Sequence, residues 1–143
     1  NGPFNRSLEE IVSLMGIKYI STSKLHKDPL GNERSKVQFH WLGQRNRFKQ
    51  IYTTRNCIFE PIFSGKDWVD SCLCDMEVAF NWHKPAIISS HRANYIGVHN
   101  KANRVNGLKQ LNLLLRTALN RWPDIQFITS EQLGQIIEES RDV

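Results

Sequence analysis

The residues best suited to chemistry follow a short apolar run in the segment 84–97, KPAIISSHRANYIG. Pro85 has no amide hydrogen to donate to a sheet and therefore suits the first residue of a strand. The apolar run after it is typical of a parallel strand that is covered on both faces, and ligands of α/β proteins collect at the carboxyl ends of such strands. The polar residues expected at that end are Ser89, Ser90, His91 and Arg92.

His91 is the first of these residues that we consider for chemistry, because an imidazole can donate and accept protons near neutral pH. The alternative interpretation is a histidine that only satisfies a hydrogen bond at the end of a strand. The rest of the chain must distinguish the two.

A second polar stretch, RNCIFEP at 55–61, follows a strand candidate at 48–51. It contains a basic residue, an amide, a carboxylate and a proline. Arg55 and Glu60 either line a substrate groove or form a structural ion pair with each other. The sequence leaves both interpretations open.

Helices and strands alternate along the chain, and they must position these two stretches. The spacing of apolar residues predicts the helices, and short apolar runs predict the strands. The helices are expected at 8–15, 66–82, 108–122 and 130–137. The strands are expected at 17–20, 37–42, 48–51, 85–88 and 125–129, with a loop at 25–34. This alternation predicts a single α/β domain over residues 1–143 with a mostly parallel sheet.

Capping signals support three of the helix boundaries. Ser7 and Glu10 have the spacing of a capping box, Gly16 is a typical stop for that first helix, and Ser130 is the expected cap of the last helix. In the second helix, Cys72 lies on the apolar stripe together with Met76. Core packing is therefore the expected role of this thiol, and not metal binding.

The net charge of +5 and the isoelectric point near 9.3 raise the question of nucleic acid. Arg45, Arg47, Lys49 and Arg55 are clustered with aromatic residues between them, as on surfaces that follow a phosphate backbone. The other basic residues are spread evenly and no nucleic-acid-binding motif occurs, so no nucleic-acid partner is predicted. No apolar run approaches the roughly 18 residues that cross a membrane, and three cysteines do not form a disulfide framework. These features predict a cytoplasmic protein without a membrane partner.

Two runs, PAIISSHRANYIG and NRVNGLKQLNLLLRTALNRWPDIQFITSEQLGQII, resemble the C-terminal part of bacterial polysaccharide deacetylase-like proteins of the NodB-homology superfamily. The resemblance implies the second half of an irregular (β/α) barrel. It places His91 at the late histidine that protonates the leaving group, and Arg55 in an arginine-and-proline motif. It further implies a sugar-binding rim, whose candidate residues here are Ser89, Ser90, Arg92, Asn94 and Glu60.

The same resemblance implies a divalent metal, often zinc, held by an aspartate and two histidines in two early motifs. Neither motif occurs in this chain. We therefore predict no metal ligand and no cofactor in the chain itself, and a zinc site only in a longer polypeptide. On this interpretation the chain is the C-terminal portion of a hydrolase that removes acetyl groups from a glycan, and it is inactive alone.

A non-catalytic carbohydrate-binding or interaction module with the same fold is the alternative function. Helical periodicity places Trp68 and Trp122 in the core, so Trp41 and Trp82 are the candidate platforms for sugar rings. Half of a barrel would also leave sheet edges without a partner, from which a homodimer through exposed edges is expected.

Overall fold

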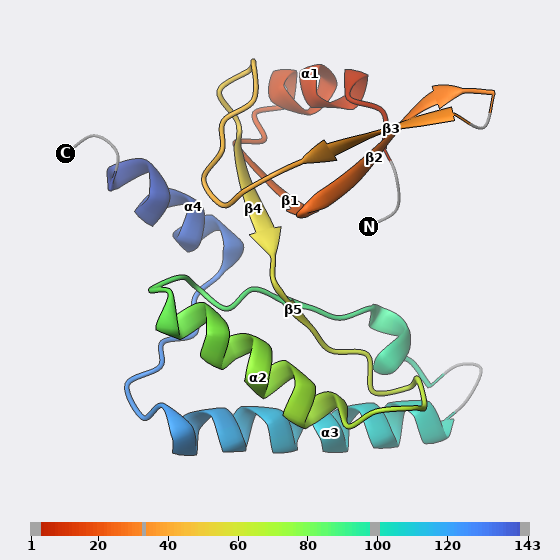
Figure 1. The fold of residues 1–143 in the computed structure, drawn as a ribbon, viewed down its shortest axis with the longest axis vertical. Coiled ribbons are helices and arrows are strands. Elements are labelled where there is room, and N and C mark those ends of the chain that lie inside the picture. Colours follow the sequence, from red (N-terminus) through yellow and green to blue (C-terminus); the bar gives the residue numbers. More distant parts are fainter. Residues whose placement is uncertain (1–3, 33, 98–100, 141–143) are drawn as a thin grey trace. The chain divides into compact units, whose positions relative to one another are not determined.

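The computed structural model describes residues 4–32, 34–97 and 101–140, and it divides into two compact units (Figure 1). The first unit comprises Asn1–Arg55 and Phe127–Val143, and the second comprises Asn56–Gln126. Each is described by itself below. The class is mixed α/β, as predicted, and no strands close into a barrel within the described ranges.

The described residues of the first unit form two helices and four strands. These are α1 (Ser7–Leu14), β1 (Tyr19–Ser23), β2 (Leu25–Gly31), β3 (Arg34–Phe39), β4 (Ile51–Arg55) and α4 (Ser130–Glu139). β1 and β4 pair in parallel, with Tyr19 opposite Ile51 and Ser23 opposite Arg55. Helix α4 packs on both strands, and Gly134 lies so close to the Tyr19 ring that a Cβ there would come within 2.4 Å of it.

The ends of the two helices in this unit depart by one residue from the predicted caps. α1 begins at Ser7, with Arg6 as the N-cap, and the Asn5 side chain accepts a hydrogen bond from the Ser7 amide at 2.9 Å. The helix ends before Gly16, which adopts φ +80° as the stop signal predicted. α4 is capped by Thr129 and not by Ser130.

β2 and β3 form an antiparallel hairpin where the sequence predicted a loop at 25–34. Leu25 lies opposite Phe39, and the turn follows at Gly31 and Asn32, which both have left-handed φ values. The turn residues Gly and Asn were therefore correctly interpreted, but the loop prediction for the residues before them was wrong.

The prediction failed because the inward residues of β2 are polar. His26 and Asp28 are buried, whereas Leu25 and Lys27, which alternate with them, are exposed. A search for apolar residues at every second position does not detect such a strand.

Three other strand predictions were shifted along the chain. The strand expected at 17–20 lies at Tyr19–Ser23. The strand expected at 37–42 lies at Arg34–Phe39, and the strand expected at 48–51 lies at Ile51–Arg55. Lys49 has a left-handed φ of 66°, which excludes a strand through that position. The polar pair Thr53 and Thr54 is buried in β4 instead.

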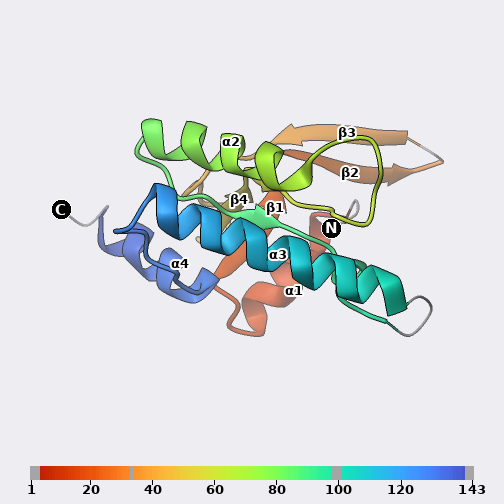
Figure 2. The ribbon, with the colours of Figure 1, turned by 90° about the horizontal axis from the view of Figure 1, so that it is seen from below.

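The second unit consists of β5 (Cys57–Ile58), α2 (Trp68–Asn81), β6 (Ile88–Ser89), a 3₁₀ turn η1 (Arg92–Asn94) and α3 (Lys101–Arg121). β5 and β6 pair in parallel. Figures 1 and 2 show α2 and α3 side by side, and their contact closes a core with β5. The buried residues of this core are Cys57, Phe59, Val69, Cys72, Leu73, Met76, Leu114 and Ala118.

Two predicted strands of the sequence are shorter or absent. β6 covers only Ile88–Ser89, because the Asn56 side chain forms hydrogen bonds with the backbone of the preceding residues. Asn56 Oδ1 accepts from the Ile87 amide at 2.7 Å, and Nδ2 donates to the Pro85 carbonyl at 3.0 Å. No strand forms at 125–129. The Ile125 amide instead bonds back to the Trp122 carbonyl in a turn.

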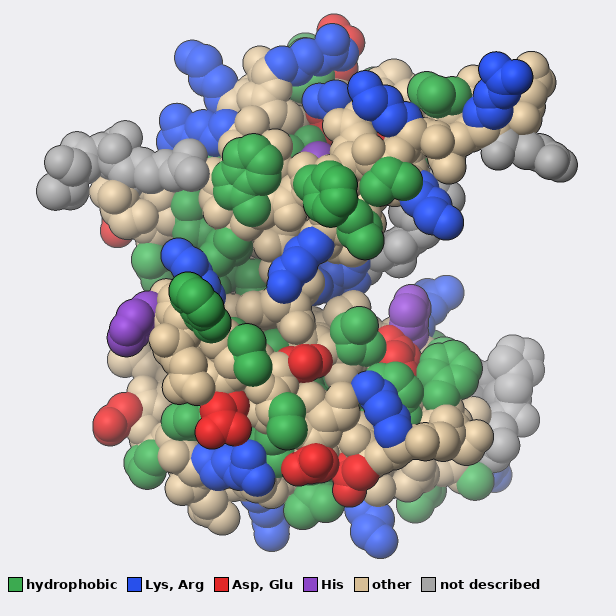
Figure 3. All heavy atoms as spheres, viewed as in Figure 1, with side chains coloured by type: hydrophobic (Ala, Val, Ile, Leu, Met, Phe, Trp, Pro, Cys, Tyr) green, Lys and Arg blue, Asp and Glu red, His purple; other side chains and the backbone are tan. Residues whose placement is uncertain are grey.

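The surface carries many large apolar side chains, as Figure 3 shows for one face. Trp41 and Trp82 are 60% and 74% exposed, in agreement with the prediction that these two indoles lie outside the core. Trp68 and Trp122 pack against the core of the second unit.

Candidate functional site

A carboxylate and an imidazole meet in the second unit at the carboxyl ends of β5 and β6. Glu60 follows β5 by two residues and His91 follows β6 by two residues, so the parallel pairing of the strands brings them together. The Glu60 Oε1 lies 2.6 Å from His91 Nδ1, and it also accepts from the His91 backbone amide at 3.1 Å. The pair was not predicted as such, although both residues were candidates.

The two side chains differ strongly in exposure. The Glu60 side chain is 7% exposed, whereas the His91 side chain is 66% exposed. A carboxylate accepts hydrogen bonds only, so Nδ1 carries the hydrogen of this contact. The neutral ring then has its lone pair on Nε2, the nitrogen distal to the carboxylate.

Asn94 forms a hydrogen bond with the second carboxylate oxygen of Glu60. It is fully buried, and its Nδ2 donates to Glu60 Oε2 at 2.7 Å and to the His91 carbonyl at 2.8 Å. Its Oδ1 accepts from the Ile62 amide at 3.2 Å. Asn94 thus ties the segment after β5 to the segment after β6, and its burial gives it a positioning role and not a contact with substrate.

Helix α3 holds Asn94 in place through a close backbone approach. A Cβ on Gly107 would lie 1.9 Å from the Asn94 carbonyl oxygen, so only glycine fits at that position. One residue earlier, Asn106 Nδ2 donates to the Pro61 carbonyl at 3.2 Å. The Asn-Gly pair in α3 therefore supports the backbone on both sides of the Glu60–His91 pair, which sequence analysis did not detect.

The remaining candidates lie at varying distance from this pair. The Ser90 hydroxyl bonds to the Tyr95 hydroxyl at 2.8 Å and accepts from Asn94 Nδ2 at 3.2 Å. The Ser89 carbonyl accepts from the Phe59 amide, as part of the strand pairing. Arg92 is exposed in η1 next to His91, where its guanidinium is available to an anionic or polar ligand.

Arg55 belongs to the first unit, at the end of β4. It is half-buried, and this burial lowers the pKa of its guanidinium. The ion pair of Arg55 with Glu60 stays a prediction; the two oxygens of Glu60 are bonded to His91 and Asn94.

The implied metal does not fit the residues that the structure describes. Among them, no group of three or more His, Cys, Asp or Glu side chains is arranged to hold a metal ion. Cys72 is buried in the core, as predicted, and burial raises the pKa of its thiol to about 12. Within the same described ranges, no helix has the length and apolar character to cross a membrane.

A buried polar cluster in the first unit has a different character. The rings of Phe4 and His26 stack at 3.9 Å between centroids, and His40 continues toward Tyr52 at 4.1 Å. His26 Nδ1 and His40 Nε2 are 3.4 Å apart, and the Tyr52 hydroxyl donates to the buried carboxylate of Glu9. All its polar members are buried, so the cluster is structural and not a site open to substrate.

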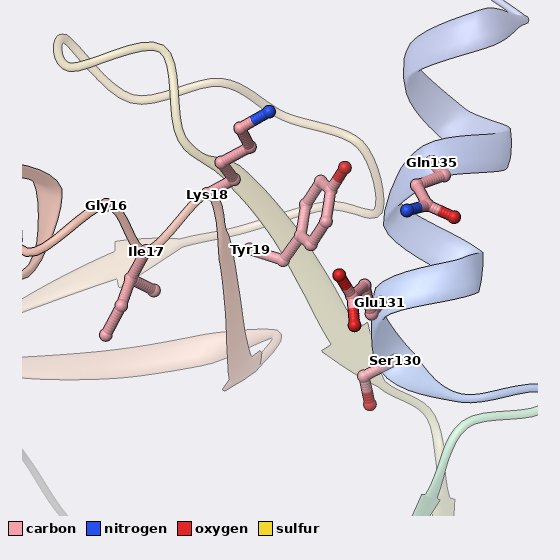
Figure 4. Close-up of a pocket in the computed structure, with 7 residues that line it drawn as sticks. All are labelled: Gly16, Ile17, Lys18, Tyr19, Ser130, Glu131 and Gln135. Atoms are coloured by element: carbon pink, nitrogen blue, oxygen red, sulfur yellow. The ribbon is translucent and has the colours of Figure 1, made fainter.

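A surface hollow of about 390 Å³ lies between the start of β1 and the first turns of α4 (Figure 4). Its lining residues are Gly16, Ile17, Lys18, Tyr19, Ser130, Glu131 and Gln135. The Tyr19 hydroxyl donates to Glu138 at 2.8 Å, and this bond raises the pKa of Tyr19. Most of the lining is exposed, so the hollow lacks the desolvated polar groups that the Glu60–His91 pair has.

Comparison with known proteins gives no match to any protein-family model, curated protein or solved structure. The candidate site therefore rests on its geometry. Of the predicted residues, the structure brings together Glu60, Ser90, His91 and Asn94, and it places Arg92 beside them.

Proposed function

We propose that the chain is the C-terminal portion of a carbohydrate-active hydrolase that is similar to metal-dependent polysaccharide deacetylases, with His91 as its general acid. The observation that carries the proposal is the 2.6 Å contact between buried Glu60 and exposed His91. A carboxylate on Nδ1 orients an imidazole and selects its tautomer, and the distal nitrogen then faces the reacting group.

In this proposal the His91 ring enters the step as an imidazolium with a hydrogen on each nitrogen, and Nε2 gives its proton to the leaving nitrogen or oxygen of the sugar as the bond to the acetyl carbon breaks. The resulting neutral imidazole keeps its hydrogen on Nδ1, toward Glu60. Arg92 and Ser90 contact the polar groups of the glycan near this point. The water that attacks the acetyl carbon is activated by groups in a longer polypeptide, and no step is assigned to a metal on this chain.

The test is acetate release from an acetylated glycan by the polypeptide that contains these residues. His91→Ala should reduce the rate by about 10²- to 10⁴-fold, the usual contribution of a positioned acid–base group, with folding unchanged because the side chain is exposed. Glu60→Gln should lower the rate less and change the pH profile, since the ring is no longer held by a carboxylate.

His83→Asn is the matched control, since His83 is another exposed histidine of the second unit. Its left-handed φ of 52° is tolerated by asparagine. Normal acetate release by the His91 variant would refute the acid role, and equal losses in the His91 and His83 variants would show a general effect of the substitution.

A carbohydrate-binding module without catalysis is the second candidate function, and it is favoured by the exposure of Trp41 and Trp82. Glycan binding that persists in His91→Ala and requires one of these indoles would support it.

A homodimer through strand edges is part of the same proposal, because each described sheet has two strands and therefore two outer edges. Sedimentation velocity at two protein concentrations would detect such a dimer.

A further inference from the structure

Helix α3 carries a second apolar face besides the one that packs into the core. The buried residues of the helix, Gly107, Leu114 and Ala118, fall together on its core side. Because each residue of an α-helix is rotated by about 100° from the one before, a second row falls within about 80°, roughly 110° round from these buried residues. We call this row the outer seam. Its members are Val105, Leu108, Asn112, Leu115 and Leu119.

The outer seam is open to solvent although most of its members are aliphatic. Val105, Leu108 and Leu119 are 68%, 45% and 45% exposed. Asn112 is exposed as well, and Leu115 is half-buried. Figure 2 shows α3 along its length with α2 beside it. Single exposed leucines are normal on a protein surface, but a continuous row of aliphatic side chains indicates an interaction surface.

The spacing of the outer seam is that of a coiled coil. Positions 105, 108, 112, 115 and 119 are separated by three and four residues in turn, which is the a and d pattern of heptad repeats. Val105, Asn112 and Leu119 occupy a positions, and the two remaining leucines occupy d positions. One asparagine among the a residues fixes the register of a coiled coil at a cost in its stability. The seam therefore suits another helix that lies along it in one register.

Basic residues border the outer seam on both sides. Lys109 and Arg116 occupy e positions on one side, Arg104 occupies a g position on the other, and all three are exposed. Residues 101–121 include no aspartate or glutamate, and none of the ion pairs between described residues uses these three cations. Since e and g residues determine which helix pairs with which, these cations favour a partner helix with carboxylates opposite them.

The charges also select against the other possible occupants. In an antiparallel pair of two copies of α3, Lys109 of one copy would face Arg116 of the other, and in a parallel pair Arg104 would face Lys109. Like-charge repulsion opposes both arrangements. A helix that binds a membrane surface needs a broad apolar face, whereas the outer seam is narrow and has Asn112 at its centre. An acidic amphipathic helix satisfies both the spacing and the charge.

We propose that the outer seam of α3 binds an amphipathic helix of a partner protein, with apolar residues at its a and d positions and glutamate or aspartate at its e and g positions. The leucines of the seam pack between the apolar residues of the partner, and Lys109 and Arg116 pair with its carboxylates. None of the seam residues belongs to the Glu60–His91 site, so the inference does not depend on the proposed function.

The experiment measures binding of the 143-residue chain to two synthetic peptides of about four heptads each, by isothermal titration. The acidic peptide has leucine at a and d, one central asparagine at a, and glutamate at e and g. The basic peptide has lysine in place of each glutamate. The acidic peptide should bind at least tenfold more tightly than the basic one, its binding should weaken with added salt, and circular dichroism should show a gain of helix in the complex.

Leu108→Ala and Leu119→Ala should each weaken binding of the acidic peptide by roughly tenfold, the order expected for one leucine lost from a helix interface. Leu113→Ala is the matched control. Leu113 is 51% exposed on the same helix but lies about 120° round from the seam, so binding should be unchanged. Two separate seam variants keep the test valid if one of them misfolds, which circular dichroism would reveal.

A double charge reversal tests the electrostatic part by itself. Lys109→Glu combined with Arg116→Glu should reverse the preference between the two peptides, because the e positions of α3 then repel glutamate and attract lysine. An unchanged preference in this double variant would overturn the assignment of an acidic partner.

Several other results would overturn the proposal. These are no binding of the acidic peptide, equal binding of the two peptides, or equal losses in Leu108→Ala and Leu113→Ala. Tighter binding to vesicles of phosphatidylserine and phosphatidylcholine than to the acidic peptide would assign the seam to a membrane surface instead. A dimer that Leu108→Ala abolishes would assign it to a second copy. Loss of peptide binding in a longer polypeptide that contains these residues would assign it to another segment of the same chain.

Discussion

Replacing Gly107 by alanine should displace Asn94 and, through it, the Glu60–His91 pair. The new Cβ would lie 1.9 Å from the Asn94 carbonyl oxygen, whereas ordinary contacts begin at 3.4 Å. The neighbouring atom is backbone and belongs to a fully buried residue, so it cannot rotate away. Helix α3 or turn η1 must therefore move by more than about 1 Å.

The expected size of the effect follows from two opposing contributions. Alanine is a better helix former than glycine by about 1 kcal/mol, while overpacking of a close contact typically costs about 1–3 kcal/mol and occasionally more. Because the clash is with a fixed backbone oxygen, we expect a net loss of about 2 kcal/mol in the free energy of unfolding. With a typical urea dependence, this lowers the unfolding midpoint by about 1 M.

The assay combines urea unfolding, followed by circular dichroism, with proton NMR of the His91 ring. The variant should lose stability and should also change the resonance of the Nδ1 hydrogen that faces Glu60. Gly97→Ala is the control, since its Cβ would meet Arg104 side-chain atoms at 3.4 Å, an ordinary contact. A Gly107→Ala protein as stable as the parent, with an unchanged His91 signal, would refute the reasoning.

Three further predictions concern stability. Leu114→Ala should lower the free energy of unfolding by about 2–5 kcal/mol in urea unfolding, because Leu114 is fully buried in the core of the second unit. Leu113→Ala, at a half-exposed neighbour, should change the free energy of unfolding by less than about 1 kcal/mol. Thr129→Ala should cost about 1 kcal/mol in urea unfolding, because it removes the capping box of α4; an unchanged midpoint would contradict this role. Burial lowers the pKa of His40 below its ordinary value of 6.5, so the neutral ring is favoured in the folded state, and the stabilisation is present above pH 6.5 and lost as the pH falls below it. Urea unfolding at pH 7.5 and 5.5 should show this decrease, and His40→Gln should make it smaller; an equal decrease in both proteins would exclude His40 as its source.

The sequence predicted α2 and the end of α3 well because their signals are local. The start of α3 was predicted wrongly: the helix begins at Lys101, seven residues before the expected start at 108. The stripe that contains Cys72 and Met76 defines the buried face of α2, and the structure buries both residues. Gly16 ends α1 for a reason that needs no partner, since a left-handed φ costs glycine nothing. Single-residue errors at Ser7 and Ser130 arose because neighbouring residues compete for the same capping position.

The strands were predicted less well because a strand depends on partners that lie far away in sequence. The segment 125–129 has the composition of a strand but finds no partner, and Thr129 is used as a helix cap instead. β2 was missed because its inward residues, His26 and Asp28, are polar and are satisfied only by the cluster around them. No local pattern indicates that such residues will be buried.

The residue types at the candidate site were evident from the sequence by itself: His91 after an apolar run, and Glu60 in a second polar stretch. Only the tertiary structure decided that they form a pair, because parallel pairing of β5 and β6 joins positions 31 residues apart. The structure also decided that Asn94 is buried beneath them, since the glycine at 107 lets α3 approach its backbone. Residue chemistry is inherent in the sequence, whereas proximity and burial arise from contacts that form only when distant segments pack together.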